Sequence, residues 1–200
     1  MPLPTFDKLA APKKEKLVAA AVGEFSRLPY DRVSIFEVAR RAGISRSSFY
    51  YYFADKEDLY QYLIGLLREE LLRALPASVR PDEAPALLLD FFADQREREW
   101  GSFVARMLER AQSWPRGGPE TIGPSDGWLR KRFSDSGGFD RLDRRDQKLV
   151  GFIVRECLCY QLGAYYRREI TREQLHQEAQ RMMELLRYGV AGRHAAGVAL

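Results

Sequence analysis

Two observations predict that this chain folds into helices only. Apolar residues recur at helical spacing through most of the 200 residues, and no stretch shows the alternation of a half-buried strand. Two short helical segments lie roughly three residues apart on either side of Gly43, which is the spacing of a helix-turn-helix. A chain of this length can also bury a core without disulfides or metals as staples. The predicted fold class is therefore all-α.

A stripe of apolar residues predicts the first long helix. The stripe runs from Leu17 to Leu28, and Pro29 stops the helix because proline lacks a backbone N–H and clashes with the preceding turn. A second, short helix begins at Ser34. Its Ser-x-x-Glu pattern, completed by Glu37, predicts a capping box in which each side chain binds the other residue's backbone amide.

The turn between the two short helices has signals of its own. Gly43 supplies the left-handed residue that ends the second helix, and Ser45 offers an N-cap to the third, which is predicted over residues 45–53. A fourth helix is predicted over residues 55–75, where an acidic pair caps its start. The prolines that follow this fourth helix mark a boundary between two parts of the chain.

The remainder of the chain is predicted to be helical as well. Glycines and prolines interrupt it at 113–127 and 134–140, and a Thr-x-x-Gln capping box starts the last helix at Thr171. The predicted helices cover residues 82–94, 97–112, 128–133, 143–168 and 171–189.

The composition narrows the class of protein. Lys and Arg number 32 against 28 Asp and Glu, a net charge of +4 that is too small to indicate a polyanionic partner by itself. Residues 1–12 lack the apolar core of a signal peptide, and no segment approaches the ~20 apolar residues of a membrane span. We therefore expect a cytoplasmic protein that does not enter a membrane.

The sequence carries no pattern of a catalytic or metal site. Cys157 and Cys159 lie two residues apart in an apolar run, which suits neither a disulfide framework nor a zinc site. They are either a redox switch or packing residues with inert thiols. Paired His and Glu ligands, a phosphate-binding glycine loop and a nucleophile elbow are also missing. We expect no enzyme activity, no cofactor and no metal.

The segment at residues 44–53, ISRSSFYYYF, is the most informative part of the chain. Consecutive residues of a helix point about 100° apart, so its last four aromatic residues cannot all enter one core. One or two of the tyrosines must face solvent or a partner. This helix end is either a half-buried surface with wet hydroxyls or a binding surface.

The first turn of the same helix favours DNA binding. It carries Arg46 among three serines, side chains that are small or basic and that a major groove accepts at close range. The arginine would bind guanine through O6 and N7, and the hydroxyls would bind phosphates.

Lys56 is a cation in the first turn of a helix, where the helix dipole disfavours it by about 0.3–1 kcal/mol. Either the neighbouring acidic residues offset this cost, or the lysine and the helix N-terminus together bind a phosphate. Its place just after a helix-turn-helix favours the phosphate.

Residues 34–59 resemble the DNA-binding signature of the TetR family of bacterial transcriptional regulators; their sequence is SIFEVARRAGISRSSFYYYFADKEDL. The resemblance extends over about residues 13–64. It implies a three-helix DNA-binding domain at 1–64, joined by the fourth helix to a helical ligand-binding and dimerisation domain at 65–200. It further implies a homodimer, formed mainly by the last two long helices. This dimer is expected to repress transcription by binding a double-stranded DNA operator, and to respond to a small-molecule effector.

The family's pattern implies which residues contact DNA. Arg46 and Ser47 take base-reading positions, and Lys56 takes the position of a phosphate-binding lysine. Further implied contacts with phosphate or bases are Ser45, Ser48, Tyr50 and Tyr52, with Tyr51 beside them.

Two residues depart from the family's pattern. Phe36 stands where a polar or charged residue is usual, and Tyr52 stands where histidine is frequent. The tyrosine hydroxyl still permits a contact, whereas Phe36 leaves a direct contact from the second helix in doubt. An exposed phenylalanine also fits an alternative, in which the chain is a helical protein-interaction or ligand-carrying module that has lost DNA binding.

The C-terminal part carries weaker signals. Residues 149–166 are apolar on nearly every side, so this helix needs neighbours on most faces, and a second copy of the chain would supply one. Two copies related by a twofold axis would place their recognition helices about 34–36 Å apart on a palindromic operator. Candidate lining residues of an effector cavity, or else ordinary core residues, are Trp100, Phe103, Met107, Trp114, Trp128, Phe133, Tyr160 and Tyr165.

Overall fold

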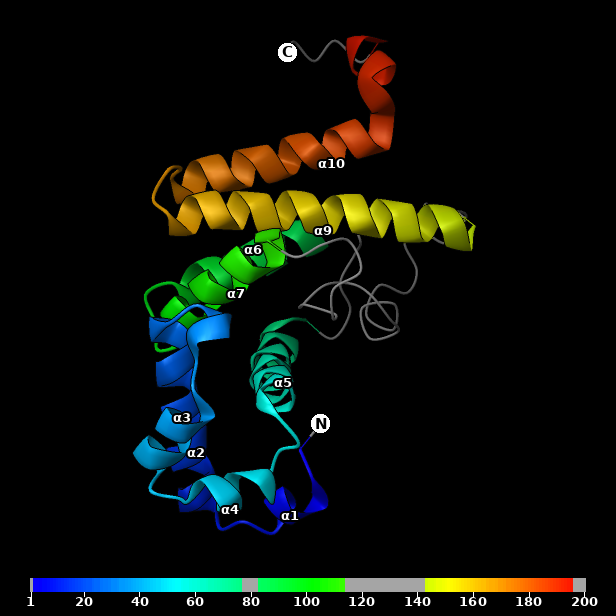
Figure 1. Ribbon diagram of the computed structural model, residues 1–200. Coiled ribbons are helices and arrows are strands. Elements are labelled where there is room, and N and C mark those ends of the chain that lie inside the picture. The colour runs from blue at the N-terminus through cyan, green and yellow to red at the C-terminus, as the bar shows by residue number, and fades with distance from the viewer. Residues whose placement is uncertain (1, 77–82, 114–142, 196–200) are drawn as a thin grey trace. The chain divides into compact units, whose positions relative to one another are not determined.

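The computed structural model describes residues 2–76, 83–113 and 143–195, and every regular element in these ranges is helical (Figure 1), which confirms the predicted fold class. The elements are α1 (Pro4–Asp7), α2 (Ala11–Arg27), the 3-10 helix η1 (Tyr30–Arg32), α3 (Ile35–Ala42), α4 (Arg46–Tyr50), α5 (Lys56–Ala74), α6 (Ala84–Gln95), α7 (Gly101–Ser113), α9 (Arg144–Tyr166) and α10 (Arg172–Ala195). Within the described ranges no helix is long and apolar enough to cross a membrane. The predicted helix at 128–133 and the connections on either side of it lie outside these ranges.

The elements divide into two compact units. The first unit holds α1 to α5, up to Arg73, together with α7. The second unit holds α6, up to Asp94, together with α9 and α10. The helix-turn-helix therefore shares its unit with α7, a helix that follows it by some fifty residues in the sequence.

The core of the first unit forms around α2. Leu17, Ala21 and Phe25 recur every four residues on one side of this helix and are fully buried, as the apolar stripe predicts. The Phe25 ring lies 5.1 Å from that of Tyr60 on α5 and 6.4 Å from that of Phe103 on α7, measured between centroids. These aromatic contacts bind three helices of the unit into one core.

The helix-turn-helix consists of α3 and α4, and its turn forms as the sequence predicts. Gly43 adopts a left-handed φ of 70°, and its N–H donates to the carbonyl of Arg40 at 3.2 Å, while the N–H of Ile44 donates to Ala39 at 3.0 Å. Two carbonyls at the end of α3 are thereby satisfied. Ser45 is the N-cap of α4, because its hydroxyl accepts a hydrogen bond from the Ser48 N–H at 3.0 Å.

Two predictions about these helices were wrong. The capping box at Ser34 does not form: this side chain makes no capping hydrogen bond, and Glu37 instead binds Arg40 one turn further on, at 2.7 Å. The guanidinium competes for the carboxylate more strongly than a backbone amide does. The third helix is also shorter than predicted, since α4 ends at Tyr50 and leads into a turn.

The start of α5 confirms the predicted acidic cap. The Asp58 N–H donates to the Asp55 carboxylate at 2.7 Å, and the Asp58 carboxylate accepts from the Ala54 N–H at 3.1 Å. From there α5 buries leucines at every fourth position, which fixes one face of the helix in the core. The helix-turn-helix is thus followed at once by a firmly anchored helix.

The short helix α1 was not predicted, and it covers the end of the helix-turn-helix. The Leu3 N–H donates to the carbonyl of Tyr52 at 2.8 Å. The ring of Phe6 is buried, with its centroid 4.9 Å from that of Phe53 and 5.1 Å from that of Tyr62. Phe6 therefore closes the aromatic core beneath the turn that follows α4.

The helix α7 begins at Gly101 rather than at residue 97. A side chain at Gly101 would lie 2.3 Å from the carbonyl oxygen of Arg96, closer than any real contact allows, so only glycine fits this turn. The preceding residues form turns instead, with the Arg98 N–H donating to Gln95 at 2.9 Å.

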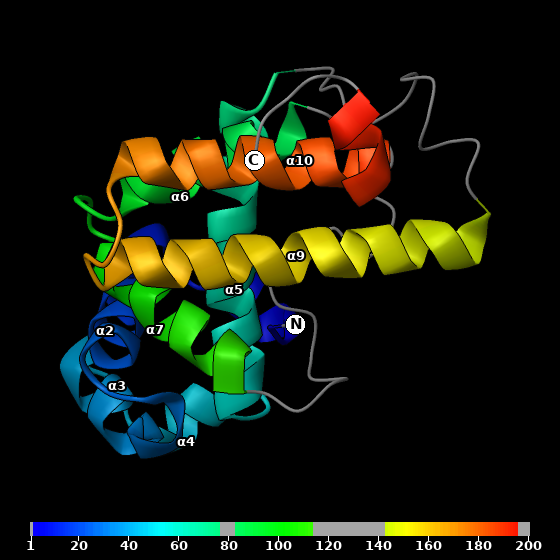
Figure 2. The same cartoon turned by 90° about the horizontal axis from the view of Figure 1, so that it is seen from above.

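In the second unit, α9 and α10 lie side by side and run in opposite directions (Figures 1 and 2). Asp143 caps α9, and the predicted box of Thr171 and Gln174 caps α10 through reciprocal bonds of 2.8 and 3.2 Å. Both caps place the helix starts where the sequence predicts them.

Polar contacts hold α6 against these two helices. The Tyr166 hydroxyl donates to the Phe92 carbonyl at 2.7 Å. The guanidinium of Arg172 binds the carboxylates of Asp90 and Asp94, at 2.5 and 2.7 Å. In the second unit α6 is therefore fixed to α9 and α10 near the junction of these two helices.

Candidate nucleic-acid interface

The orientation of α4 is set by one buried ring. Phe49 is completely buried and stacks on Phe53, with 5.6 Å between centroids. Because residues of a helix point in fixed directions about 100° apart, burying this ring turns the first turn of α4 outward. Arg46 and Ser47 are accordingly exposed.

Serine hydroxyls surround the start of α4. The Ser45 Oγ lies 2.9 Å from the Ser47 Oγ and 2.7 Å from the Ser48 Oγ. The first two side chains are exposed and the third is half-buried. Three hydroxyls that exchange donor and acceptor roles in this way can present a donor to a phosphate oxygen.

The tyrosines that follow differ in exposure, and two of them face solvent, as the sequence predicts. The exposed fraction is 68% for Tyr51 and 43% for Tyr50. Tyr52 is half-buried, and its ring meets Phe6 edge-on at 6.1 Å. The hydroxyl of Thr5 also donates to the Tyr51 carbonyl. Tyr50 and Tyr51 are thus the two accessible rings, whereas Tyr52 packs partly against α1.

Lys56 makes contacts that the sequence did not indicate. Its Nζ lies 2.9 Å from the carbonyl oxygen of Tyr30, 3.3 Å from that of Val33 and 3.4 Å from that of Asp31. It also lies 4.5 Å from the centroid of the Tyr30 ring. The ammonium group therefore caps the end of η1. Its implied contact with a phosphate stays a prediction, and it would require the ammonium to share or exchange these partners.

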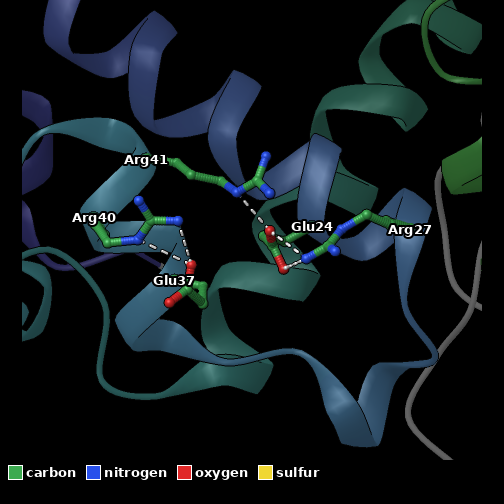
Figure 3. A network of polar contacts seen from close by, with 5 residues as sticks. All are labelled: Glu24, Arg27, Glu37, Arg40 and Arg41. Atoms are coloured by element: carbon green, nitrogen blue, oxygen red, sulfur yellow. Dashed lines mark hydrogen bonds and ion pairs between the residues drawn. The ribbon is translucent and has the colours of Figure 1, made fainter.

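The arginines of α3 are paired within the chain (Figure 3). The Glu24 side chain is completely buried, yet it binds Arg41 of α3 at 2.7 Å and Arg27 of its own helix at 3.0 Å. Arg40 binds Glu37, and this hydrogen bond holds the pKa of the Glu37 carboxyl below its usual value. In contrast, Arg46 has no acidic partner among the described residues.

An open groove of about 310 Å³ joins the two helices of the helix-turn-helix to the start of α5. It brings together three of the residues implied to contact DNA, Arg46, Tyr50 and Lys56. Arg46 and Tyr50 are four residues apart and share a face of α4. The lining residues are Val33, Ser34, Ile35, Phe36, Arg46, Tyr50, Asp55 and Lys56.

The candidate effector residues divide between the two units. Phe103 and Met107 are buried in the first unit, where the Phe103 ring lies 5.5 Å from that of Trp100. In the second unit Tyr165 is buried, whereas Tyr160 is 69% exposed. The other three, Trp114, Trp128 and Phe133, lie outside the described residues. An effector role for this set stays a prediction.

The surroundings of Cys159 on α9 bear on whether the two cysteines form a redox switch. Burial, reinforced by the charge of Glu156, raises the pKa of the Cys159 thiol to about 11. A thiol with such a pKa is protonated at neutral pH and reacts slowly, because the thiolate is the nucleophile. This favours the interpretation of Cys159 as a packing residue.

Sequence reasoning missed Glu24, which holds α3 against α2. The signal was present in the sequence: Glu24 lies in the apolar stripe of the first long helix, between Ala21 and Phe25. An acidic residue at a core position indicates a buried partner, because an unpaired buried charge costs several kcal/mol. That partner is one of the two adjacent arginines of the next helix.

The comparisons with known proteins agree with this geometry. Residues 17–63 match the family model of bacterial regulatory proteins of the tetR family. Over these residues the chain resembles the DNA-binding domain of the TetR family. The matched range runs from α2 into α5, and so covers the whole helix-turn-helix, in agreement with the resemblance seen in residues 34–59.

Proteins similar to this chain include a curated protein and solved structures. The uncharacterized HTH-type transcriptional regulator YvdT of Bacillus subtilis (strain 168) is 28% identical over 88 residues, which are 44% of this chain and 45% of the relative. The chain thus matches less than half the length of this curated relative.

Two solved structures share the fold of this chain. The TetR-like transcriptional regulator from Rhodococcus sp. RHA1 is 20% identical, with a TM-score of 0.51 over 94% of this chain and 98% of the other. The fatty acid degradation regulator FadR from Bacillus halodurans is 14% identical, with a TM-score of 0.51 over 88% and 96%. At these identities the likeness concerns the fold alone.

Proposed function

We propose that this chain is a transcriptional repressor of the TetR type that acts in the cytoplasm as a homodimer, binds a palindromic operator and releases it when a small-molecule effector binds. The observation that carries the proposal is the placement of α4. Burial of Phe49 turns Arg46 and the serine hydroxyls outward on a helix that a firm turn holds beside α3. This is the arrangement by which a recognition helix enters a major groove.

The chemistry of this exposed turn supports sequence-specific binding. Arg46 presents a planar fork of donors that fits O6 and N7 of guanine, while the exposed hydroxyls of Ser45 and Ser47 suit phosphate oxygens. Arg40 and Arg41 are engaged with carboxylates. Specificity would therefore depend on few side chains, with Arg46 first among them.

An apolar stripe on α9 supports the homodimer. Leu149, Phe152, Ile153 and Tyr160 are all exposed within one chain, although they are large and apolar. Their spacing of three, four and eleven residues places them on one face of the helix. The charged residue on that face, Glu156, is already paired with Arg155 at 2.8 Å. A second copy of the same stripe would cover these side chains by an isologous contact.

Release by an effector would follow from a shift between two arrangements of the dimer. A ligand that binds only the arrangement unable to span an operator must favour it, and DNA must weaken ligand binding by the same factor. The candidates for its contacts among the described residues remain Trp100, Phe103, Met107, Tyr160 and Tyr165. A compound that raises the melting temperature of the protein and dissociates the operator complex would identify the effector.

Selection from random duplexes at moderate salt tests the DNA-binding part of the proposal. We expect enrichment of an inverted repeat whose half-sites lie about one helical turn apart, and affinity that falls steeply with salt as phosphate contacts release counterions. The proposal would be wrong if no duplex were preferred over bulk DNA. Weak duplex binding with little salt dependence would instead favour the protein-interaction module.

A further inference from the structure

Phe36 is the most exposed phenylalanine in the first unit, with 57% of its surface accessible. A single exposed apolar side chain is ordinary on a protein surface. The position of this one is not ordinary, because its ring lines the same groove as Arg46 and Tyr50 of the recognition helix. A side chain of α3 therefore borders the surface from which α4 would read bases.

The position of Phe36 is fixed by the packing of α3. Val38 and Ala39, two and three residues on, are almost completely buried. Arg41 is tied to the buried carboxylate of Glu24 at 2.7 Å (Figure 3). With one face of α3 in the core and one end bound to α2, the backbone at Phe36 has a defined place at the groove that Arg46 also lines.

The groove pairs an apolar surface with a cation. Phe36 and Ile35 supply apolar walls, and Arg46 supplies a guanidinium that has no acidic partner among the described residues. In a major groove the base edges offer hydrogen-bonding groups and a single kind of apolar group, the C5-methyl of thymine. A phenylalanine placed beside a base-reading arginine matches that methyl and none of the polar base edges.

We propose that Phe36 is a specificity-determining residue that packs against the C5-methyl group of a thymine next to the base contacted by Arg46. This inference rests on the proposed operator binding. Since Phe36 and Arg46 line one groove, the thymine and the base bound by Arg46 belong to the same half-site. Both helices of the motif then read bases, α3 through an apolar contact and α4 through hydrogen bonds.

The test removes the methyl group without changing any base pair. In the duplex selected by the wild-type protein, each thymine of a half-site is replaced in turn by deoxyuridine, and the affinity is measured for wild type and for Phe36→Ala. For wild type, one position is expected to lose about fourfold in affinity, the equivalent of about 0.8 kcal/mol for one buried methyl group. For Phe36→Ala, deoxyuridine at that position should make no difference.

Two controls keep the result interpretable. Phe36→Leu retains an apolar side chain and should keep part of the deoxyuridine penalty. The thermal unfolding of Phe36→Ala should match that of wild type, since the ring is largely exposed. The inference fails if no thymine responds to deoxyuridine, or if Phe36→Ala keeps the full penalty, even though a specific operator is bound. If no specific operator exists, the inference fails together with the proposed function, and a protein-docking role of Phe36 is favoured.

Discussion

The guanidinium of Arg110 stacks on the ring of Tyr30, with its central carbon 3.5 Å from the ring centroid. The same carbon lies 4.5 Å from the centroid of Tyr60, and the Nη2 binds the Glu57 carboxylate at 2.8 Å. One side chain of α7 thus contacts η1 and α5 by both cation–π and ionic interactions. Through Tyr30, whose carbonyl binds Lys56 at 2.9 Å, this contact continues to the rim of the candidate interface.

Arg110→Ala is expected to lower the free energy of unfolding by about 3 kcal/mol, because it leaves the Glu57 carboxylate without its buried cation and removes the stacking. The side chain of Arg110 is only 10% exposed. Arg106→Ala is the matched control on the same helix, since its partner Glu109 lies at the surface, and it should cost less than about 1 kcal/mol. Urea denaturation measures both, and equal losses would contradict the structural role of Arg110.

The pH dependence of stability should report on Glu57. Burial raises the pKa of this carboxyl, but hydrogen bonds from Gln61, Arg110 and Tyr30 outweigh it and hold the pKa below the ordinary value of 4.5. A depressed pKa contributes stability that is present above the ordinary value and is lost as the pH falls through the folded one. Glu57→Gln should therefore show a flatter decline in unfolding free energy below about pH 4.5. Parallel urea-derived stability curves for the two proteins would argue against this.

Lys56→Ala should affect both folding and binding. Loss of an ammonium bonded to three carbonyls is expected to lower the free energy of unfolding by about 1.5–3 kcal/mol, and loss of a phosphate contact should weaken binding to all duplexes alike. Lys16→Ala, which alters an exposed residue of α2, should change stability by less than about 0.5 kcal/mol. Unfolding curves and affinities for operator and random duplexes separate the two roles. A stability equal to wild type would show that the carbonyl contacts contribute nothing.

Arg46→Ala should change DNA binding and its sequence preference without changing the stability of the fold. Because this side chain is exposed, its removal should leave the melting temperature unchanged. Affinity for the operator should fall by ~1–3 kcal/mol, and the preference for guanine at one position of each half-site should disappear. Arg46→Lys keeps the charge without the planar fork and should not restore that preference. Equal losses on operator and random DNA would remove Arg46 from the base-reading residues.

Two glycines offer the same substitution with opposite expected results. Gly43→Ala should destabilise the protein by about 1–2 kcal/mol, because its left-handed φ of 70° disfavours a Cβ even though space is open around it. Gly23→Ala lies within α2, where nothing would contact the added methyl group, and should stabilise by about 0.5–1 kcal/mol. Urea denaturation measures both changes. A neutral Gly43→Ala would show that the turn tolerates another conformation.

The parts of the fold that the sequence predicted correctly are those set by neighbouring residues. Gly43, Ser45 and Asp55 act on backbone groups within four residues, so their patterns specify the turn and both helix starts. The cap at Ser34 was wrong because Glu37 had a second local partner, Arg40, and the sequence does not rank the two.

Contacts between residues that lie far apart in the sequence could not be predicted from the sequence. Arg110 reaches Tyr30 across eighty residues, and Phe36 lines one groove with Arg46 only because the turn brings α3 and α4 together. The candidate interface was therefore predicted residue by residue along α4, whereas the groove and the role of Lys56 in capping η1 required the packed structure. Glu24 lies between these cases, because its place in an apolar stripe was visible while the identity of its partner was not.

The buried carboxylate of Glu24 also restricts how this sequence can change over evolutionary time. Losing Arg41 first would leave the buried carboxylate with Arg27 as its remaining cation and is expected to destabilise the protein. Neutralising Glu24 first releases an arginine that is already partly exposed to water, a far milder step. In related sequences that lack this ion pair, Glu24 is thus expected to have been replaced before Arg41.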